Sequence, residues 1–147
     1  MRYLDPRISV IAVLFLLLTG CSGTYSTRDG DGETGGTEVY PLSMDDALLI
    51  MQDAMQKEFP EDRIEDIFTP HRGYRAKMRF LADIDVISVY AIPGQGRGPD
   101  GKTVDGLVFE VHRSGTYPLG GIPRSKAVLK RVVAGASRMA DALPKIE

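Results

Sequence analysis

The 147-residue chain is 43% hydrophobic and 26% charged, with a formal net charge of −2 at pH 7. Its length suits one domain rather than two, and the acidic total argues against a nucleic-acid-binding protein. The chain has one cysteine, which excludes an intramolecular disulfide, so its stability must come from a packed core.

The first 18 residues have the order of charges and apolar residues that is typical of an export signal. Two arginines lie within residues 1–7, and residues 8–18 are apolar apart from one serine. As a helix this 11-residue run would be about 17 Å long, whereas the hydrocarbon core of a membrane is about 30 Å thick. We therefore expect a cleaved signal rather than a permanent transmembrane helix.

The apolar run ends in Leu18-Thr19-Gly20-Cys21, which resembles the lipobox of bacterial lipoproteins. The resemblance implies that residues 1–20 are a lipoprotein signal peptide. It also implies that Cys21, carrying lipid such as palmitate, becomes the first residue of the mature protein and anchors it to a membrane. In sorting of the enterobacterial type, an aspartate after the lipidated cysteine retains the protein on the inner membrane, and here that residue is Ser22. The resemblance therefore implies a cell-envelope protein, attached to the outer membrane and facing the periplasm if the source has two membranes.

The segment after the cysteine is rich in Gly, Ser, Thr and Asp and has no apolar periodicity. We expect residues 21–37 to be the lipidated cysteine and a flexible tether, with an end-to-end distance of about 20–25 Å. Residues 38–147 then form a single domain. Charge is uneven along the chain: residues 21–70 hold 12 acids and 3 bases, whereas residues 71–147 hold 7 acids and 13 bases.

The first predicted helix begins after Ser43, whose hydroxyl suits an N-cap, and ends before Pro60. Its apolar residues recur at helical spacing and form one stripe: Met44, Ala47, Leu48, Met51, Ala54, Met55 and Phe59. A methionine stripe is either an adaptable groove for a partner or ordinary core, and this spacing favours core.

The middle of the chain has the period of two that is typical of β-strands. Residues 63–69 are a candidate short strand. From Tyr74 to Ile92 one parity is apolar throughout, and no Gly, Pro or Asn interrupts it. We therefore predict one long strand, bent or bulged near residues 82–85, rather than a tight hairpin.

The rest of the chain predicts a loop over Gly94–Gly106, a returning antiparallel strand over Leu107–Val111, and a closing helix. This helix begins near Pro123 or Ser125 and stops at Pro144. The expected fold class is α+β, in the order α-β-β-β-α. It has an antiparallel sheet of three or four strands with one long bent central strand, and two helices packed on one face.

One segment within the predicted loop matches a nucleotide-binding motif. Residues 96–103 fit G-x-x-x-x-G-K-T, but a P-loop must open a helix, and here β-type alternation follows. We interpret the segment as a hairpin loop. His71 and His112, taken with Asp83 and Asp85, match no metal-ligand spacing, and no catalytic triad is recognisable. We expect no metal, no cofactor and no enzymatic activity.

Two groups of basic residues are candidates for binding anions or a partner. Arg75, Lys77 and Arg79 share one face of the predicted long strand, and Lys126, Lys130 and Arg131 lie mostly on the polar side of the last helix. Each group is either an ordinary solvated surface or a patch that faces phosphates or carboxylates of the envelope or of a partner protein.

Two functions remain open at this point. The first is a membrane-anchored, non-enzymatic accessory or interaction module for another envelope component, with no nucleic-acid partner. The second is a carrier or receptor for a small or lipidic ligand held between the sheet and the helices. An apolar cavity of several hundred Å³ there would favour the carrier, and a filled core would favour the interaction module.

Overall fold

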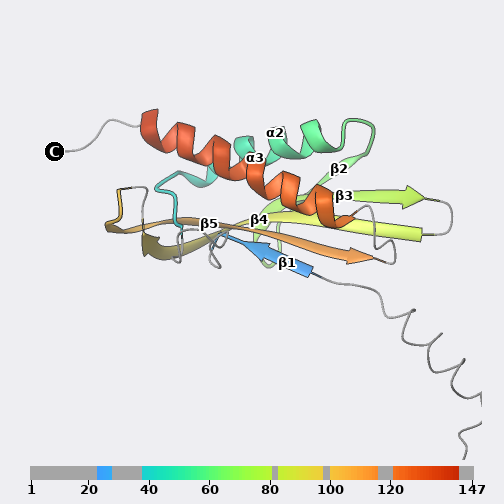
Figure 1. Ribbon diagram of the computed structural model, residues 1–147, viewed down its shortest axis with the longest axis horizontal. Helices are drawn as coiled ribbons and strands as arrows, with labels where there is room; N and C mark the ends of the chain where they lie inside the picture. Colours follow the sequence, from blue (N-terminus) through green and yellow to red (C-terminus); the bar gives the residue numbers. More distant parts are fainter. Residues whose placement is uncertain (1–22, 28–37, 81–82, 98–99, 116–120, 143–147) are drawn as a thin grey trace, which may run out of the picture.

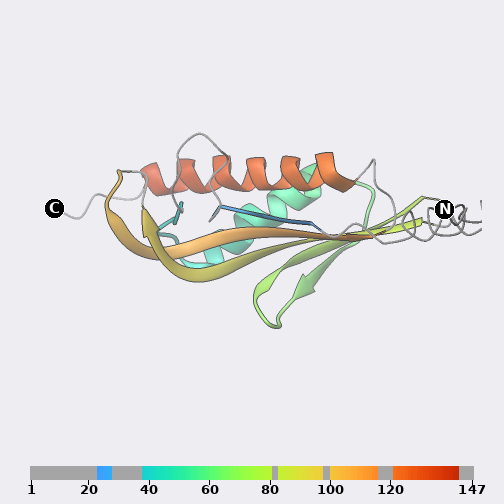
Figure 2. The same ribbon diagram turned by 60° about the horizontal axis from the view of Figure 1, so that its bottom comes forward.

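The computed structural model describes residues 23–27, 38–80, 83–97, 100–115 and 121–142, except the side chains of residues 80, 83 and 121. The predicted signal peptide and lipobox lie outside these residues. The fold is α+β, with two helices on one face of a five-stranded antiparallel sheet of order β1-β5-β4-β3-β2 (Figures 1 and 2). In chain order the elements are β1 (Gly23–Ser26), α2 (Met44–Glu58), β2 (Ile64–Ile67), β3 (Arg72–Phe80), β4 (Asp83–Arg97), β5 (Thr103–Gly115) and α3 (Gly121–Ala142).

Both helices form where the apolar periodicity predicts them. Ser43 caps α2, because its Oγ accepts a hydrogen bond from the backbone N–H of Asp46 at 3.1 Å. The second helix begins at Gly121, two to four residues earlier than expected. The methionine stripe of α2 is core: Met51 and Met55 are fully buried.

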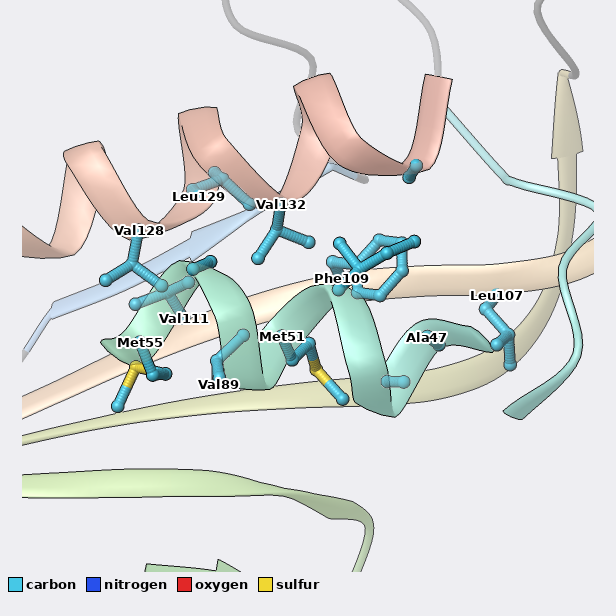
Figure 3. Packing of buried hydrophobic residues seen from close by; sticks show 14 of the residues in the cluster. Ala47, Met51, Met55, Val89, Leu107, Phe109, Val111, Val128, Leu129 and Val132 are labelled. Atoms are coloured by element: carbon cyan, nitrogen blue, oxygen red, sulfur yellow. The ribbon is translucent and has the colours of Figure 1, made fainter. Parts of the chain in front are cut away.

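The core lies between the helix layer and the sheet. Met51 and Met55 of α2 and Val132 of α3 approach Phe109 of β5 and Val89 of β4 (Figure 3), and all five side chains are at most 1% exposed. Burying side chains of this size contributes about 1.5–3 kcal/mol each. This packing fixes the helices on one face and orients the strands beneath them.

The predicted long strand is wrong, because residues 74–92 form a hairpin. Phe80 pairs with Asp83, so β3 and β4 are antiparallel neighbours joined by two residues. The apolar parity changes across this connection. Tyr74 and Ala76 face the helices in β3, whereas Ile87 and Val89 do so in β4. The even residues of β4 therefore lie on the opposite face of the sheet from the helices, and the sheet gains a strand.

The predicted loop over Gly94–Gly106 is also wrong, because β4 and β5 stay paired as far as Arg97 and Thr103. Pro93 lacks an N–H but pairs with Leu107, whose own N–H and C=O both bind Tyr40 instead. The pair therefore needs no donor from Pro93.

The described fold includes residues that precede Glu38. Residues 23–26, predicted as part of a flexible tether, form β1 and pair with β5 from Arg113 to Glu110. The side chain of Tyr25 packs against the core, and the hydroxyl of Thr27 accepts a hydrogen bond from the N–H of Phe109 at 3.2 Å. A strand of four residues is too short to show alternation, so the glycine-rich and serine-rich composition concealed it.

Candidate functional site

The sheet face opposite the helices carries a hollow of about 310 Å³. Paired residues of an antiparallel sheet point to the same side, and Ile87, Val89 and Val111 point into the core. Ser88 and His112 pair with each other, so they point to the other side, away from the helices. Strands β1, β4 and β5 all contribute to the lining: Gly23, Thr24, Val86, Ser88, Tyr90, His112, Arg113 and Ser114.

His112 of this hollow contacts a carboxylate and an aromatic ring. Its Nε2 lies 3.0 Å from Oε2 of Glu110, and its ring meets that of Tyr90 edge-on, with the centroids 5.1 Å apart. The imidazole remains 46% exposed, whereas Glu110 is 16% exposed. The hollow therefore contains a half-exposed imidazole that contacts the carboxylate of Glu110 and the ring of Tyr90.

Ser88, His112 and Glu110 are the residue types of a catalytic triad, and only the contact between His112 and Glu110 is formed. Nucleophilic catalysis needs a hydrogen bond from the serine to the histidine. The structure gives His112 a bond to Glu110 and gives no hydrogen bond between His112 and Ser88. The arrangement can accept and donate hydrogen bonds and stack against a ligand.

The strand next to the hollow carries the first group of predicted basic residues. Arg75, Lys77 and Arg79 alternate along β3, pair with Ser88, Val86 and Ile84 of β4, and are exposed, as predicted. Arg75 Nε donates to Oε2 of Glu65 at 2.8 Å. This hydrogen bond lowers the pKa of Glu65, and the Coulombic attraction of the guanidinium lowers it further. The sheet face opposite the helices, which we call the helix-free face, is therefore basic along β3.

The structure does not bring the second group of basic residues to this face. Lys126, Lys130 and Arg131 are exposed on α3, in the helix layer. The ammonium of Lys126 lies 5.9 Å from the ring centroid of Tyr25, and Arg131 Nε lies 3.4 Å from Oε2 of Glu58. The two predicted groups thus lie on opposite sides of the molecule.

A buried ion pair beneath α3 was missed by sequence reasoning. Arg113 Nε donates to Oδ2 of Asp85 at 3.0 Å, and both side chains are 2% exposed. Arg113 Nη2 is 3.0 Å from Oδ1, but this contact lacks hydrogen-bond alignment. A Cβ on Gly115 would lie 1.8 Å from Oδ1, so the glycine makes room for the carboxylate. Asp85 shares its parity with Ile87, Val89 and Ala91, the residues of β4 that face the core, but both parities of β4 are apolar, so this signal could be used only once the hairpin was recognised.

The remaining motifs lie apart from the hollow. Lys102 is followed by β5 rather than by a helix, and its N–H donates to Oδ1 of Asp100 at 3.1 Å, so the P-loop interpretation is excluded and a hairpin turn is found. His71 lies between β2 and β3, distant in the sheet order from His112. Among the described residues no group of three His, Cys, Asp or Glu side chains is placed to hold a metal ion.

Comparison with protein-family models and with curated proteins finds no match. Within the described part of the chain, neither helix is long and apolar enough to cross a membrane.

Proposed function

We propose that this protein is a lipid-anchored, non-enzymatic accessory protein of the cell envelope. Its helix-free sheet face docks on an acidic surface of another envelope protein. The observation that carries the proposal is the hollow on this face, which lies beside the exposed cations of β3. Lipid on Cys21 is the membrane anchor, and Ser22 directs the protein to the outer membrane, facing the periplasm, if the source has two membranes.

The chemistry of the face suits a partner that carries carboxylates and apolar groups. Lys77 and Arg79 are exposed cations, while Val86 and Tyr90 supply half-buried apolar surface beside them. Tyrosine and arginine are enriched where protein interfaces bind most strongly. A basic strand next to an aromatic hollow gives both electrostatic attraction and contact area.

The core supports docking rather than ligand carriage. A carrier needs a cavity of several hundred Å³ between the sheet and the helices. The described side chains in that space pack against one another, and Met51, Met55 and Phe109 are at most 1% exposed. The hollow described above lies on the other face and is lined by polar as well as apolar groups.

Site-specific photocrosslinking in living cells tests the proposal. A photoreactive amino acid at Lys77 reports on the helix-free face, and the same residue at Gln56 on the exposed side of α2 is the matched control. We expect a discrete crosslinked species from position 77 and none from position 56. It should weaken when Arg75 is replaced by glutamate, and mass spectrometry should identify an envelope protein with an acidic surface.

Equal crosslinking at positions 56 and 77 would show that the helix-free face is not the docking surface. A crosslink confined to Lys130 would move the docking surface to the helix layer. Crosslinking that does not respond to Arg75→Glu would remove the electrostatic part of the proposal.

A further inference from the structure

The end of the molecule at which β1 begins gathers the ends of several elements. Gly23 pairs with Arg113, Asp85 pairs with Gly115, and Phe80 pairs with Asp83. These pairs place the start of β1, the end of β5 and the β3–β4 connection together. The first turn of α3 lies at the same end, whereas the β4–β5 tip and the end of α3 lie at the other (Figure 1).

This end of the molecule exposes large hydrophobic side chains to solvent. Ile84 and Ile122 are 40% and 38% exposed, and they are two of the four large hydrophobic side chains that are exposed among the described residues. Ile84 pairs with Arg79, which is exposed on the same face. Arg124 lies in the first turn of α3 and is also exposed, with its guanidinium 5.5 Å from the ring centroid of Phe59. Exposed isoleucine beside exposed arginine is the composition of a surface that meets lipid headgroups.

The chain leads from this end directly to the proposed anchor. Only Ser22 lies between Cys21 and Gly23. Two residue steps span at most about 7 Å, so lipid on Cys21 holds the start of β1 at the headgroups. A 16-residue tether, as predicted from the sequence, would have allowed the domain to lie anywhere within about 20–25 Å.

We infer that this end of the molecule rests on the lipid surface, with Ile84 and Ile122 at the headgroup boundary and Arg79 and Arg124 against lipid phosphates. The inference rests on the proposed lipidation of Cys21. Both isoleucines lie near the anchor but on opposite sides of the sheet. Contact through both would point this end of the sheet at the membrane, so that neither sheet face lies on the lipid. Acidic Glu61 and Asp62 come two and three residues after Phe59, whose ring Arg124 contacts, so negative charge also lies on the α2 side of this end.

Tryptophan fluorescence can measure this orientation because the chain contains no tryptophan. Each variant then carries a single probe: Ile84→Trp and Ile122→Trp at the proposed contact, Leu49→Trp on the helix layer, and Phe68→Trp beside the β2–β3 connection. Leu49 and Phe68 are 62% and 70% exposed. The β2–β3 hairpin projects from the helix-free face (Figure 2), so position 68 reports on a domain that lies on that face.

The full-length protein, processed in cells, is purified from membranes and reconstituted into phosphatidylethanolamine vesicles with a minor fraction of phosphatidylglycerol. Brominated acyl chains then quench any tryptophan that reaches the headgroup boundary. We expect about twofold or stronger quenching at positions 84 and 122, as for a ring about 5–10 Å into the boundary region, and little at 49 and 68. Arg79→Glu with Arg124→Glu should reduce the quenching, whereas Arg97→Glu at the opposite end should not.

Vesicle flotation and the mass of the N-terminal peptide separate the two possible failures. A protein that neither floats nor carries lipid overturns the anchor and this inference with it. A lipidated protein that floats, with positions 84 and 122 unquenched, leaves the anchor intact and overturns the contact. Strong quenching at position 68 or 49 overturns the upright orientation in favour of a domain lying on one face.

Discussion

Arg75 of β3 and Glu65 of β2 form an ion pair at the solvent surface. This ion pair changes the pKa of the Glu65 carboxyl group. The hydrogen bond and charge of Arg75 lower the pKa of Glu65 below its ordinary value of 4.5. Because the folded-state pKa is depressed, any stabilisation by this pair is present above the unfolded pKa and is lost as the pH falls through the folded pKa.

Arg75→Met should therefore raise the pKa of Glu65 towards 4.5, because the first two causes of the shift are removed together. An NMR titration of the side-chain carboxyl carbon measures this directly. Lys77→Met is the control and should raise the pKa less, since Lys77 acts only by weaker Coulombic attraction. An unchanged pKa in Arg75→Met would contradict the contact.

The buried pair of Asp85 and Arg113 makes a different prediction at the same scale. Replacing either partner alone leaves a charge in a site where both side chains are 2% exposed. We expect Asp85→Ala and Arg113→Met each to lower the free energy of unfolding by about 3–5 kcal/mol. The double variant should be less destabilised than the sum of the two, as urea denaturation can show. Strict additivity would mean that the charges are not coupled.

At the scale of the elements, a glycine allows the backbones of β3 and β4 to approach closely. A Cβ on Gly73 would lie 1.9 Å from the carbonyl oxygen of Val89, which is backbone and cannot rotate away. Gly101, in the β4–β5 turn, has φ +80° but no heavy atom within 4 Å of an added Cβ. The two glycines are thus required for different reasons, one for space and one for backbone conformation.

Gly101→Ala should lower the free energy of unfolding by about 1 kcal/mol, the usual penalty for a left-handed alanine. Gly73→Ala should lower it by more, because two strands must separate. Thermal or urea unfolding of both variants gives the comparison. Equal effects would show that the sheet adjusts to the added methyl group without loss.

The helices could be predicted from sequence because their signals are local. Ser43 and the apolar stripe predict α2 from nearby residues alone. The structure contains both predicted helices, packed on the sheet. The β3–β4 hairpin could not be read in the same way. Leu81 and Ala82 have no turn chemistry, and the change of apolar parity between Ala76 and Ile87 becomes visible only when both strands are assigned to one face.

The candidate site was predicted in part for the same reason. Arg75, Lys77 and Arg79 stand on one strand face in any register, so their exposure followed from period two alone. The hollow needs the pairing of Ser88 with His112 and of Thr24 with His112. These contacts join segments far apart in the chain, and no local pattern reports them.

At the scale of the whole molecule, β1 changes what lipidation would do. With one residue between Cys21 and Gly23, lipid on Cys21 would hold the hollow close to the lipid surface, since Gly23 and Thr24 are part of its lining. A partner that docks on the anchored protein would then have to reach a surface close to the membrane, which favours a membrane protein or one that is itself anchored.

Membrane fractionation tests both the lipid anchor on Cys21 and the sorting of the protein by Ser22. Cys21→Ser should leave an uncleaved or mislocalised precursor that takes up no labelled palmitate. In a two-membrane source, the wild-type protein should fractionate with outer-membrane markers, and Ser22→Asp should shift it to the inner membrane. Palmitate uptake by Cys21→Ser would disprove the anchor, and an unmoved Ser22→Asp variant would show that this residue is not the address.

The sheet order also has a consequence for how the chain is assembled. Of the described strands, the first in sequence (β1) pairs with the last (β5), and the hydrogen bond from Phe109 to Thr27 joins residues 82 positions apart. Until β1 docks, the outer edge of β5 has unpaired backbone groups and can recruit a strand from another chain. Attachment at Cys21 would hold β1 at the membrane, where neighbouring anchored chains are confined to the same surface. We therefore expect strand exchange between molecules during folding to become more frequent as anchored chains are packed more densely.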